Sequence, residues 1–155
     1  MEYKIVRAVS DDDYRICDSM MSKLINFEST IDPLLNSGVV VNGFNKSVAS
    51  NDSFVGYATN GSPIGYVCAL LNHKKGSVNA TNMISIDTLY VEEPYRGQGI
   101  AKALVSSVEE WAYSLYKDDY SLEITTLTHN KSAMDIYSHL GFSPVRVTLR
   151  KEKGE

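Results

Sequence analysis

The chain has 155 residues, of which 43% are apolar and 22% are charged, and its formal net charge is -4. No run is dense in Lys or Arg, which argues against nucleic acid as a partner, and no apolar stretch approaches the ~20 residues that a membrane helix needs. The N-terminus is mixed and acidic rather than signal-like, so we expect a cytoplasmic protein that forms one domain over residues 1–155.

The cysteines and histidines follow neither a redox nor a metal-binding pattern. Cys17 and Cys68 lie in apolar surroundings and lack a CxxC partner, which favours buried free thiols over a disulfide. His73, His129 and His139 are not spaced as metal ligands. We therefore expect no metal site.

The first part of the chain predicts a strand followed by two helices. The β-branched stretch Tyr3–Val9 is typical of a strand. Ser10 and Asp13 resemble a capping box, and apolar residues follow at helical spacing. Asp32–Pro33 suits the start of a second, short helix, and Gly38 suits its end.

Three strands are predicted next. Ser53–Thr59 and Ile64–Leu71 flank Asn60–Gly61, whose two residues tolerate positive φ and favour a tight hairpin turn. After a polar loop, Met83–Val91 is predicted as a third consecutive strand.

The remaining elements alternate between helix and strand. Apolar residues recur every three or four positions from Ile100 to Leu115, which predicts a long amphipathic helix. Ser121–Leu127 is predicted as a strand, residues 130–141 as a helix closed by a glycine, and Val145–Lys151 as a last strand. This order predicts a mixed α/β domain with antiparallel strands first and a strand–helix–strand crossover later.

A glycine-rich turn precedes the long helix and indicates an anion site. The orphan N–H groups and partial positive charge of a helix N-terminus bind phosphate, and Gly97 and Gly99 would let it approach closely. Arg96 adds a positive charge nearby. The glycines alone are also compatible with a turn that has only a geometric role.

A dinucleotide-binding turn is a second alternative. That turn needs a third small residue, but Lys102 stands at its position. Residues 92–96 also separate the predicted strand from the first glycine, and the unit follows an antiparallel hairpin. This spacing disfavours a Rossmann turn.

The third alternative is a resemblance to a known family. Residues 96–101, RGQGIA, resemble the Q/R-x-x-G-x-G/A pyrophosphate loop of the GCN5-related N-acetyltransferases (GNAT). Residues 129–142, HNKSAMDIYSHLGF, resemble the second block of that family. The resemblance to specific motifs covers roughly residues 85–150, whereas the earlier part of the chain fits only the family's element order.

The resemblance implies a fold and a cofactor. The fold would be a GNAT-like central sheet with antiparallel N-terminal strands and a splayed parallel pair in the middle, flanked by about four helices. Acetyl-CoA would lie between the two splayed strands. The residues implied to bind it are Leu89, Tyr90, Val91, Arg96, Gly97, Gln98, Gly99, Ile100, Ala101 and Asn130.

Catalysis requires a group that accepts the proton of the attacking amine and one that protonates the departing thiolate. Within the family block, Tyr137 would lie near the sulfur as the acid, although a tyrosine on an apolar helix face is often a core residue. Asp87 interrupts an apolar strand and is either the base or a solvated residue. Glu28 and Asp32 could bind a cationic acceptor or could be a surface charge and a helix cap.

The resemblance thus predicts an acetyl-CoA-dependent N-acetyltransferase that acts on a primary amine of a small molecule or a peptide. The acidic balance favours a cationic acceptor such as a polyamine or aminoglycoside. A non-catalytic acyl-CoA-binding regulator of the same fold is the alternative. Only about one strand's length follows Phe142, which would leave the acceptor site poorly covered, so we expect a homodimer with the last strand at its interface.

Overall fold

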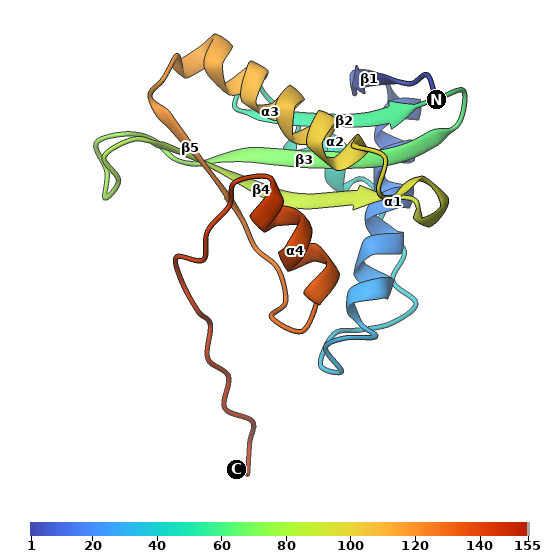
Figure 1. Cartoon of the computed structure of the whole chain (residues 1–155), viewed down its shortest axis with the longest axis vertical. Coiled ribbons are helices and arrows are strands. Elements are labelled where there is room, and N and C mark those ends of the chain that lie inside the picture. Colours follow the sequence, from blue (N-terminus) through green and yellow to red (C-terminus); the bar gives the residue numbers. More distant parts are fainter. Residues whose placement is uncertain (155) are drawn as a thin grey trace.

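The computed structural model describes residues 1–154, which form a five-stranded sheet with helices on both faces (Figure 1). The elements in chain order are β1 (Lys4–Arg7), α1 (Asp11–Glu28), α2 (Phe44–Val48), β2 (Ser53–Thr59), β3 (Pro63–His73), β4 (Asn82–Val91), the 3₁₀ turn η1 (Glu93–Tyr95), α3 (Ile100–Tyr116), β5 (Tyr120–Ile124) and α4 (Lys131–His139). The mixed α/β fold with four flanking helices is therefore confirmed.

The sheet has the order β1-β2-β3-β4-β5. The first four strands are antiparallel, and β5 runs parallel to β4. Pairing between β4 and β5 ends at Ile86 and Ile124, although β4 continues to Val91. The two strands of the parallel pair therefore separate, as expected, and open the sheet at the carboxyl end of β4.

A bulge in β4 lies close to this opening. Cys68 and Ala69 of β3 pair with Thr88 and Ile86 of β4, which leaves Asp87 as an extra residue between them. A bulge bends its strand and changes the direction of nearby side chains and amides, and such bulges are common beside active sites.

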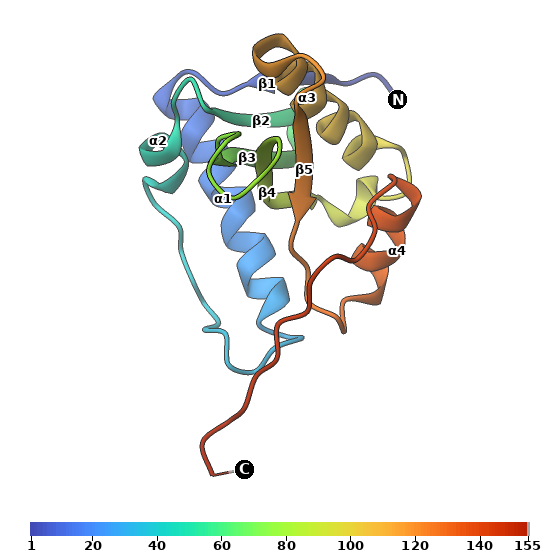
Figure 2. The same cartoon turned by 90° about the vertical axis from the view of Figure 1, so that its left-hand side faces the viewer.

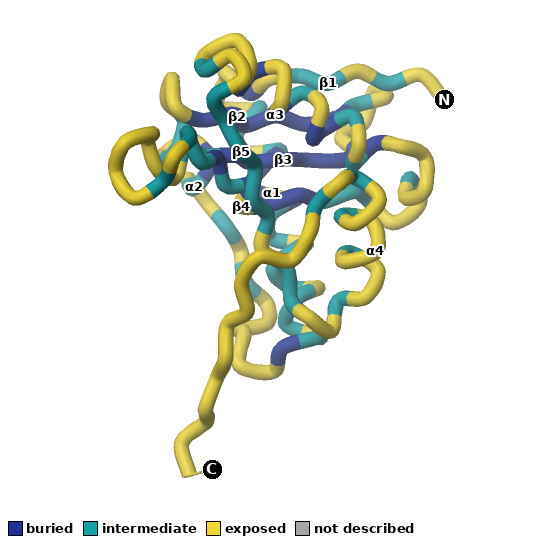
Figure 3. Tube along the Cα trace, turned by 60° about the vertical axis from the view of Figure 1, so that its left-hand side comes forward, coloured by how far each residue is buried: buried dark blue, intermediate teal, exposed yellow. Residues whose placement is uncertain are grey.

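Each face of the sheet carries its own apolar core (Figure 2). On one face, the buried side of α3 packs on alternate residues of the strands, and Trp111 lies against Phe54 with ring centroids 6.2 Å apart. On the other face, Cys17 and Met20 of α1 pack on Tyr57, Tyr66 and Cys68. Figure 3 shows that the central strands are the most buried part of the trace.

The predicted capping box at the start of α1 is confirmed. The amide of Asp13 donates to Oγ of Ser10 at 3.1 Å, and the amide of Ser10 donates to the Asp13 carboxylate at 3.2 Å. Three aspartates in the first turn complement the partial positive charge of the helix N-terminus. The cysteine prediction is also confirmed, because Cys17 and Cys68 are buried free thiols.

The predicted helix after Asp32–Pro33 is wrong. Residues 32–42 form turns and bends, and the second helix is α2, further along the chain. Leu34 and Leu35 are 57% and 39% exposed, so this segment lacks the packed apolar face from which short helices gain most of their stability. Asp32 was expected to cap this helix. Instead, its carboxylate accepts a hydrogen bond from the amide of Leu34 and pairs with the guanidinium of Arg150 through both oxygens.

A buried polar network holds α2 in place. The Asp18 carboxylate accepts hydrogen bonds from the amides of Gly43 and Asn45 and from the Asn45 side chain at 2.7–3.0 Å. Asn45 in turn accepts from the hydroxyl of Tyr66 at 2.6 Å. Because buried polar groups need partners, this network fixes the loop before α2 onto α1 and β3.

The predicted strand Val145–Lys151 is also wrong, because the segment is extended but has no strand partner among residues 1–154. Arg146 pairs with Glu123, and Arg150 pairs with Asp32. The apolar side chains of this segment, Val145, Val147 and Leu149, are 73%, 73% and 89% exposed. As a result β5 is an edge strand, and the tail runs away from the sheet (Figure 1).

Within the described residues 1–154, none of the helices combines the length and apolar character required to cross a membrane.

Candidate functional site

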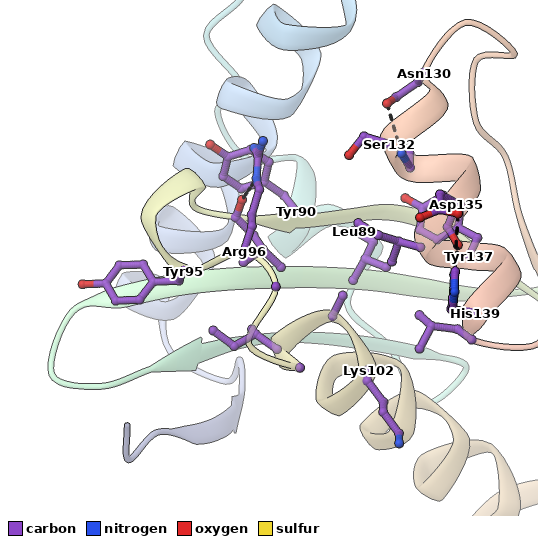
Figure 4. Close-up of a pocket in the computed structure, with 18 of the residues that line it drawn as sticks. Leu89, Tyr90, Tyr95, Arg96, Lys102, Asn130, Ser132, Asp135, Tyr137 and His139 are labelled. Atoms are coloured by element: carbon purple, nitrogen blue, oxygen red, sulfur yellow. Dashed lines mark hydrogen bonds and ion pairs between the residues drawn. The ribbon is translucent and has the colours of Figure 1, made fainter.

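A cavity of about 580 Å³ lies where β4 separates from β5 (Figure 4). Its walls come from the end of β4, the turn before α3, the first turn of α3, one face of α4 and the last turns of α1. The cavity includes most of the residues expected to bind a cofactor, namely Leu89, Tyr90, Val91, Arg96, Gly97, Gly99, Ile100, Ala101 and Asn130. The elements that form it are far apart in the sequence.

The glycine turn gives one end of this cavity the shape of an anion cradle. Gly97 and Gly99 have φ values of 77° and 82°, in the left-handed region that favours glycine. No other atom lies within 4 Å of where a Cβ would stand at either position, so both turns are open on that side. Gly99 is the N-cap of α3, whose first turn carries no acidic residue. The free amides of that turn can therefore bind a pyrophosphate.

Gln98 does not line the cavity, because its side-chain amide turns back to the carbonyl of Pro94 at 3.4 Å. Its backbone remains part of the turn. Any role of Gln98 in binding would therefore come from the main chain.

Arg96 lines the cavity but uses its side chain within the protein. Its Nε donates to the carbonyl of Val91 at 2.9 Å, which closes the turn between β4 and the glycines. Its guanidinium lies 5.7 Å from the ring centroid of Tyr90 and 5.9 Å from that of Phe27 on α1. Figure 4 shows Arg96 lying along Tyr90.

Asn130 begins α4 and lines the cavity from that side. Its Oδ1 accepts from the amide of Ala133 at 3.2 Å, which caps the helix. Within residues 1–154 its Nδ2 has no partner, so this amide can donate to a ligand in the cavity.

Tyr137 lies on the α4 face that closes the cavity (Figure 4). Its ring packs edge-on against Phe142 with centroids 6.2 Å apart. Burial raises the pKa of Tyr137 to about 12, and the nearby charge of Glu28 acts in the same direction. The hydroxyl is therefore protonated at neutral pH and can donate a proton or a hydrogen bond.

A second, smaller cavity of about 30 Å³ adjoins the first and contains Asp87 and Glu28. Leu24, Leu89, Asn130 and Tyr137 line both cavities, so the two spaces lie on either side of the same side chains. Burial raises the pKa of both carboxyl groups above their ordinary values. Neither carboxylate is in an ion pair among the described residues.

Asp32 lies outside both cavities. The guanidinium of Arg150 and the amide of Leu34 hold the pKa of its carboxyl below the ordinary value. Of the two acidic residues expected to bind an acceptor, only Glu28 therefore faces the site.

Leu24 and Phe27 are wall residues that motif comparison does not identify. Leu24, Phe27 and Glu28 are spaced i, i+3 and i+4, which places them on one face of α1. The helical spacing was readable from the sequence, but nothing in it indicated that this face would meet the end of β4.

Comparison with known proteins agrees with this geometry. Residues 25–142 match the model of the acetyltransferase (GNAT) family. An N-acetyltransferase of Methanocaldococcus jannaschii is 28% identical over 96 residues, which are 62% of this chain and 41% of that protein. The thialysine N-epsilon-acetyltransferase of Bos taurus is 41% identical over 58 residues, 37% of this chain and 33% of that protein. The matches thus span less than half of either relative.

Solved structures share the fold over nearly the whole chain. A tetramutant of the BH1408 protein of Bacillus halodurans has a TM-score of 0.81 at 18% identity and covers 96% of this chain and 99% of its own. The aminoglycoside acetyltransferase AAC(6')-Iy, in complex with a bisubstrate analogue of CoA, has a TM-score of 0.72 at 16% identity and covers 99% of both chains. The family model, with the glycine cradle and the splayed strands, leads to one conclusion: the chain belongs to the acetyltransferase (GNAT) family.

Proposed function

We propose that this protein, as a single domain, transfers the acetyl group of acetyl-CoA to a primary amine of a small molecule or peptide by direct attack. One observation carries the proposal: the cavity at the Gly97–Ala101 cradle shares Tyr137 as a wall with a smaller cavity that contains Asp87 and Glu28. A site for a phosphate-containing donor thus adjoins a site with groups that can move protons.

Donor binding would rest mainly on the backbone. The amides of Gly97 to Ala101 would hold the pyrophosphate, and the unpaired edge of β4 at Leu89 and Val91 would bind the pantetheine arm and the acetyl carbonyl. Asn130 would donate to that arm. The donor supplies a thioester, which an amine attacks without a covalent enzyme intermediate.

Proton transfer would fall to two side chains. A lysine-like amine has an ordinary pKa of about 10.4, so it must lose a proton before it attacks. Asp87, whose raised pKa makes it a better base, would accept this proton directly or through water. Tyr137, protonated at neutral pH, would donate to the departing thiolate.

The two buried cysteines are poorly suited to a nucleophilic role. Neither lines a cavity of the site, and burial raises the pKa of Cys68 to about 12 and raises that of Cys17 as well.

The acceptor is proposed to be a cationic amine, such as a polyamine or an aminoglycoside. The small cavity contains two carboxyl groups and no basic side chain among the described residues. Fold neighbours include aminoglycoside acetyltransferases, and one sequence relative is named for thialysine. A non-catalytic acyl-CoA sensor is the second candidate, because it would have the same glycine cradle. Such a sensor would not require Asp87 and Tyr137 in the same small cavity.

We further propose a cytoplasmic homodimer. The two free cysteines suit a reducing compartment. The tail exposes Val145, Val147 and Leu149, and one edge of β5 has no strand partner among residues 1–154. Two copies of this extended segment could pair across a two-fold axis and bury the apolar side chains of both.

The first test is binding of CoA, measured by calorimetry on the wild type and on Gly99→Val. Because residue 99 lies in the cradle, we expect Gly99→Val to weaken binding at least about tenfold. Gly76→Val is the matched control, since Gly76 also has positive φ and open space but lies in the remote β3–β4 loop. Equal affinity of the wild type and Gly99→Val would remove the cradle from the site.

The second test is a screen of amines for release of free thiol from acetyl-CoA. Thiol release that depends on a cationic amine would support transfer. Tight CoA binding with no thiol release from any polyamine, aminoglycoside or lysine analogue would favour the sensor.

A further inference from the structure

The cofactor cavity and the acceptor cavity meet at the last turn of α1. Phe27 lies in the larger cavity, Glu28 lies in the smaller one, and Leu24 lines both. The position of this single turn therefore sets where Glu28 stands relative to Asp87 and Tyr137.

The last turn of α1 leaves much of its surface without cover from the sheet. Phe27 is 41% exposed, and the chain after Glu28 continues as turns rather than as a regular element. Helix ends of this kind open readily, so contacts at this turn decide how well it is held.

The turn before α3 supplies such contacts. The guanidinium of Arg96 lies between the rings of Phe27 and Tyr90, and its Nε is fixed by the Val91 carbonyl. A charge held over an aromatic ring gives a cation–π attraction even at an exposed site such as this one. Arg96 directly precedes Gly97, so the residue that touches α1 is joined to the cradle by one peptide bond.

A second contact also joins α1 to the segment that follows β4. Nζ of Lys23 lies 2.5 Å from the carboxylate of Glu92, and this hydrogen bond raises the pKa of Lys23. The hydroxyl of Tyr90 donates to the same carboxylate at 3.4 Å. Lys23 is one turn before Phe27, so the Lys23 link alone would allow the last turn of α1 to move.

We infer that Arg96 is a positioning residue, which acts through Phe27 to hold the last turn of α1 and thereby Glu28. The inference rests on the proposed function, because the cradle must bind CoA. A ligand in the cradle restricts the backbone of Gly97, and this restriction reaches α1 through the Arg96–Phe27 stack. CoA binding therefore orders the wall of the acceptor cavity.

The test is hydrogen exchange of the amides of residues 24–31, measured with and without CoA. CoA is added at roughly ten times the Kd that calorimetry gives for each protein, so weaker binding cannot imitate lost coupling. In the wild type we expect CoA to slow exchange in this segment about threefold or more, as a cation–π contact of this kind allows.

Two variants separate coupling from direct contact. Arg96→Gln keeps a side-chain donor for the Val91 carbonyl but removes the charge, and Phe27→Leu keeps apolar bulk but removes the ring. We expect both to bind CoA and to lose the slowing in residues 24–31. Tyr113→Leu is the control, because it breaks an equivalent exposed pair with Lys117 on α3 and should keep the slowing.

Each other outcome overturns the inference. Slowing that persists in Arg96→Gln would mean that CoA touches α1 directly. No slowing in a wild type that binds CoA would remove the coupling but leave the proposed function intact. A wild type that does not bind CoA at all would overturn both.

Discussion

At the scale of single residues, the site depends on how burial changes the chemistry of ordinary side chains. Tyr137 and Asp87 both lie where cavity walls penalise the charged form, so the tyrosine keeps its proton and the carboxyl group binds one more strongly than usual. The raised pKa of the carboxyl group favours its role as a proton acceptor, and the tyrosine carries the proton that a donor must have at neutral pH.

Tyr137→Phe tests the donor. The variant keeps the ring that packs on Phe142 and loses only the hydroxyl, so the melting temperature should change little. If the hydroxyl protonates the thiolate, kcat should fall by about 100- to 10,000-fold while CoA affinity stays near the wild-type value. A normal kcat with a lowered melting temperature would return Tyr137 to the role of a core residue.

Asp87→Asn tests whether Asp87 accepts the proton of the amine. The substitution should change both the rate and the free energy of unfolding. Because the pKa of Asp87 is raised in the folded state, the stability it contributes is present at low pH and is lost as pH rises through that pKa. The free energy of unfolding of the variant should therefore be higher than that of the wild type at pH 7 and equal to it below pH 3.8. The kcat of the variant should be about 100-fold or more lower.

Asp32→Asn provides the opposite control for the same measurements. The pKa of Asp32 is lowered by Arg150, so its stabilising effect is present at pH 7 and is lost as pH falls. Denaturant unfolding at pH 7 should show a loss of stability. At pH 7, a higher free energy of unfolding for Asp32→Asn, or a lower one for Asp87→Asn, would contradict the environments assigned to these two carboxyl groups.

At the scale of elements, the site requires close contact between α3 and the sheet. A Cβ at Gly65 of β3 would stand 3.0 Å from Ile100, 3.1 Å from Leu104 and 3.2 Å from the carbonyl of Tyr90. The absence of a side chain at Gly65 therefore lets the first turn of α3 lie directly against the strands, which sets the position of the cradle.

Gly65→Ala should weaken that contact. Overpacking of a tight site typically costs about 1–3 kcal/mol, and we expect a loss of unfolding free energy in this range. Because one of the contacting residues, Ile100, begins α3 directly after the cradle, CoA affinity should fall together with stability. The measurements are denaturant unfolding and calorimetry, and stability lost with unchanged CoA affinity would show that the cradle does not depend on this contact.

At the scale of the whole molecule, the tail is an exposed segment that pairs with no strand among residues 1–154. Arg146 and Arg150 tie it to Glu123 and Asp32, and its apolar side chains point to solvent. An exposed apolar segment and an unpaired edge strand are each prone to pair with another chain, which is the basis of the proposed dimer.

Light scattering at tens of micromolar tests this dimer against the 17.2 kDa mass of one chain. We expect about twice this mass for the wild type and the single mass for Val147→Asp, because a charge in the apolar stripe should prevent pairing. Val78→Asp is the control, since Val78 is 88% exposed in the β3–β4 loop and its substitution should leave the dimer intact. A wild type with the mass of one chain would contradict the proposal.

The features that the amino-acid sequence predicted correctly are those with local causes. The capping box of α1, the hairpin turn between β2 and β3, and the helix start after Gly99 follow from hydrogen bonds and dihedral preferences within a few residues. For the same reason the glycine turn and the start of α4 at Asn130 could be located from short stretches of sequence, and helical spacing put Tyr137 on the apolar face of α4.

Contacts between distant segments decided the rest. Asp32 looked like a helix cap but pairs with Arg150, which is 118 residues away. Arg96 was predicted only to add a positive charge near the glycines, and its contact with the ring of Phe27 on α1 had no signal in the sequence. The final stretch has the alternation of a strand, yet a strand also needs a neighbouring edge, and this chain does not place its own edge there. Such pairings depend on which surfaces the packed helices and sheet bring together, and periodicity along one segment carries no information about them.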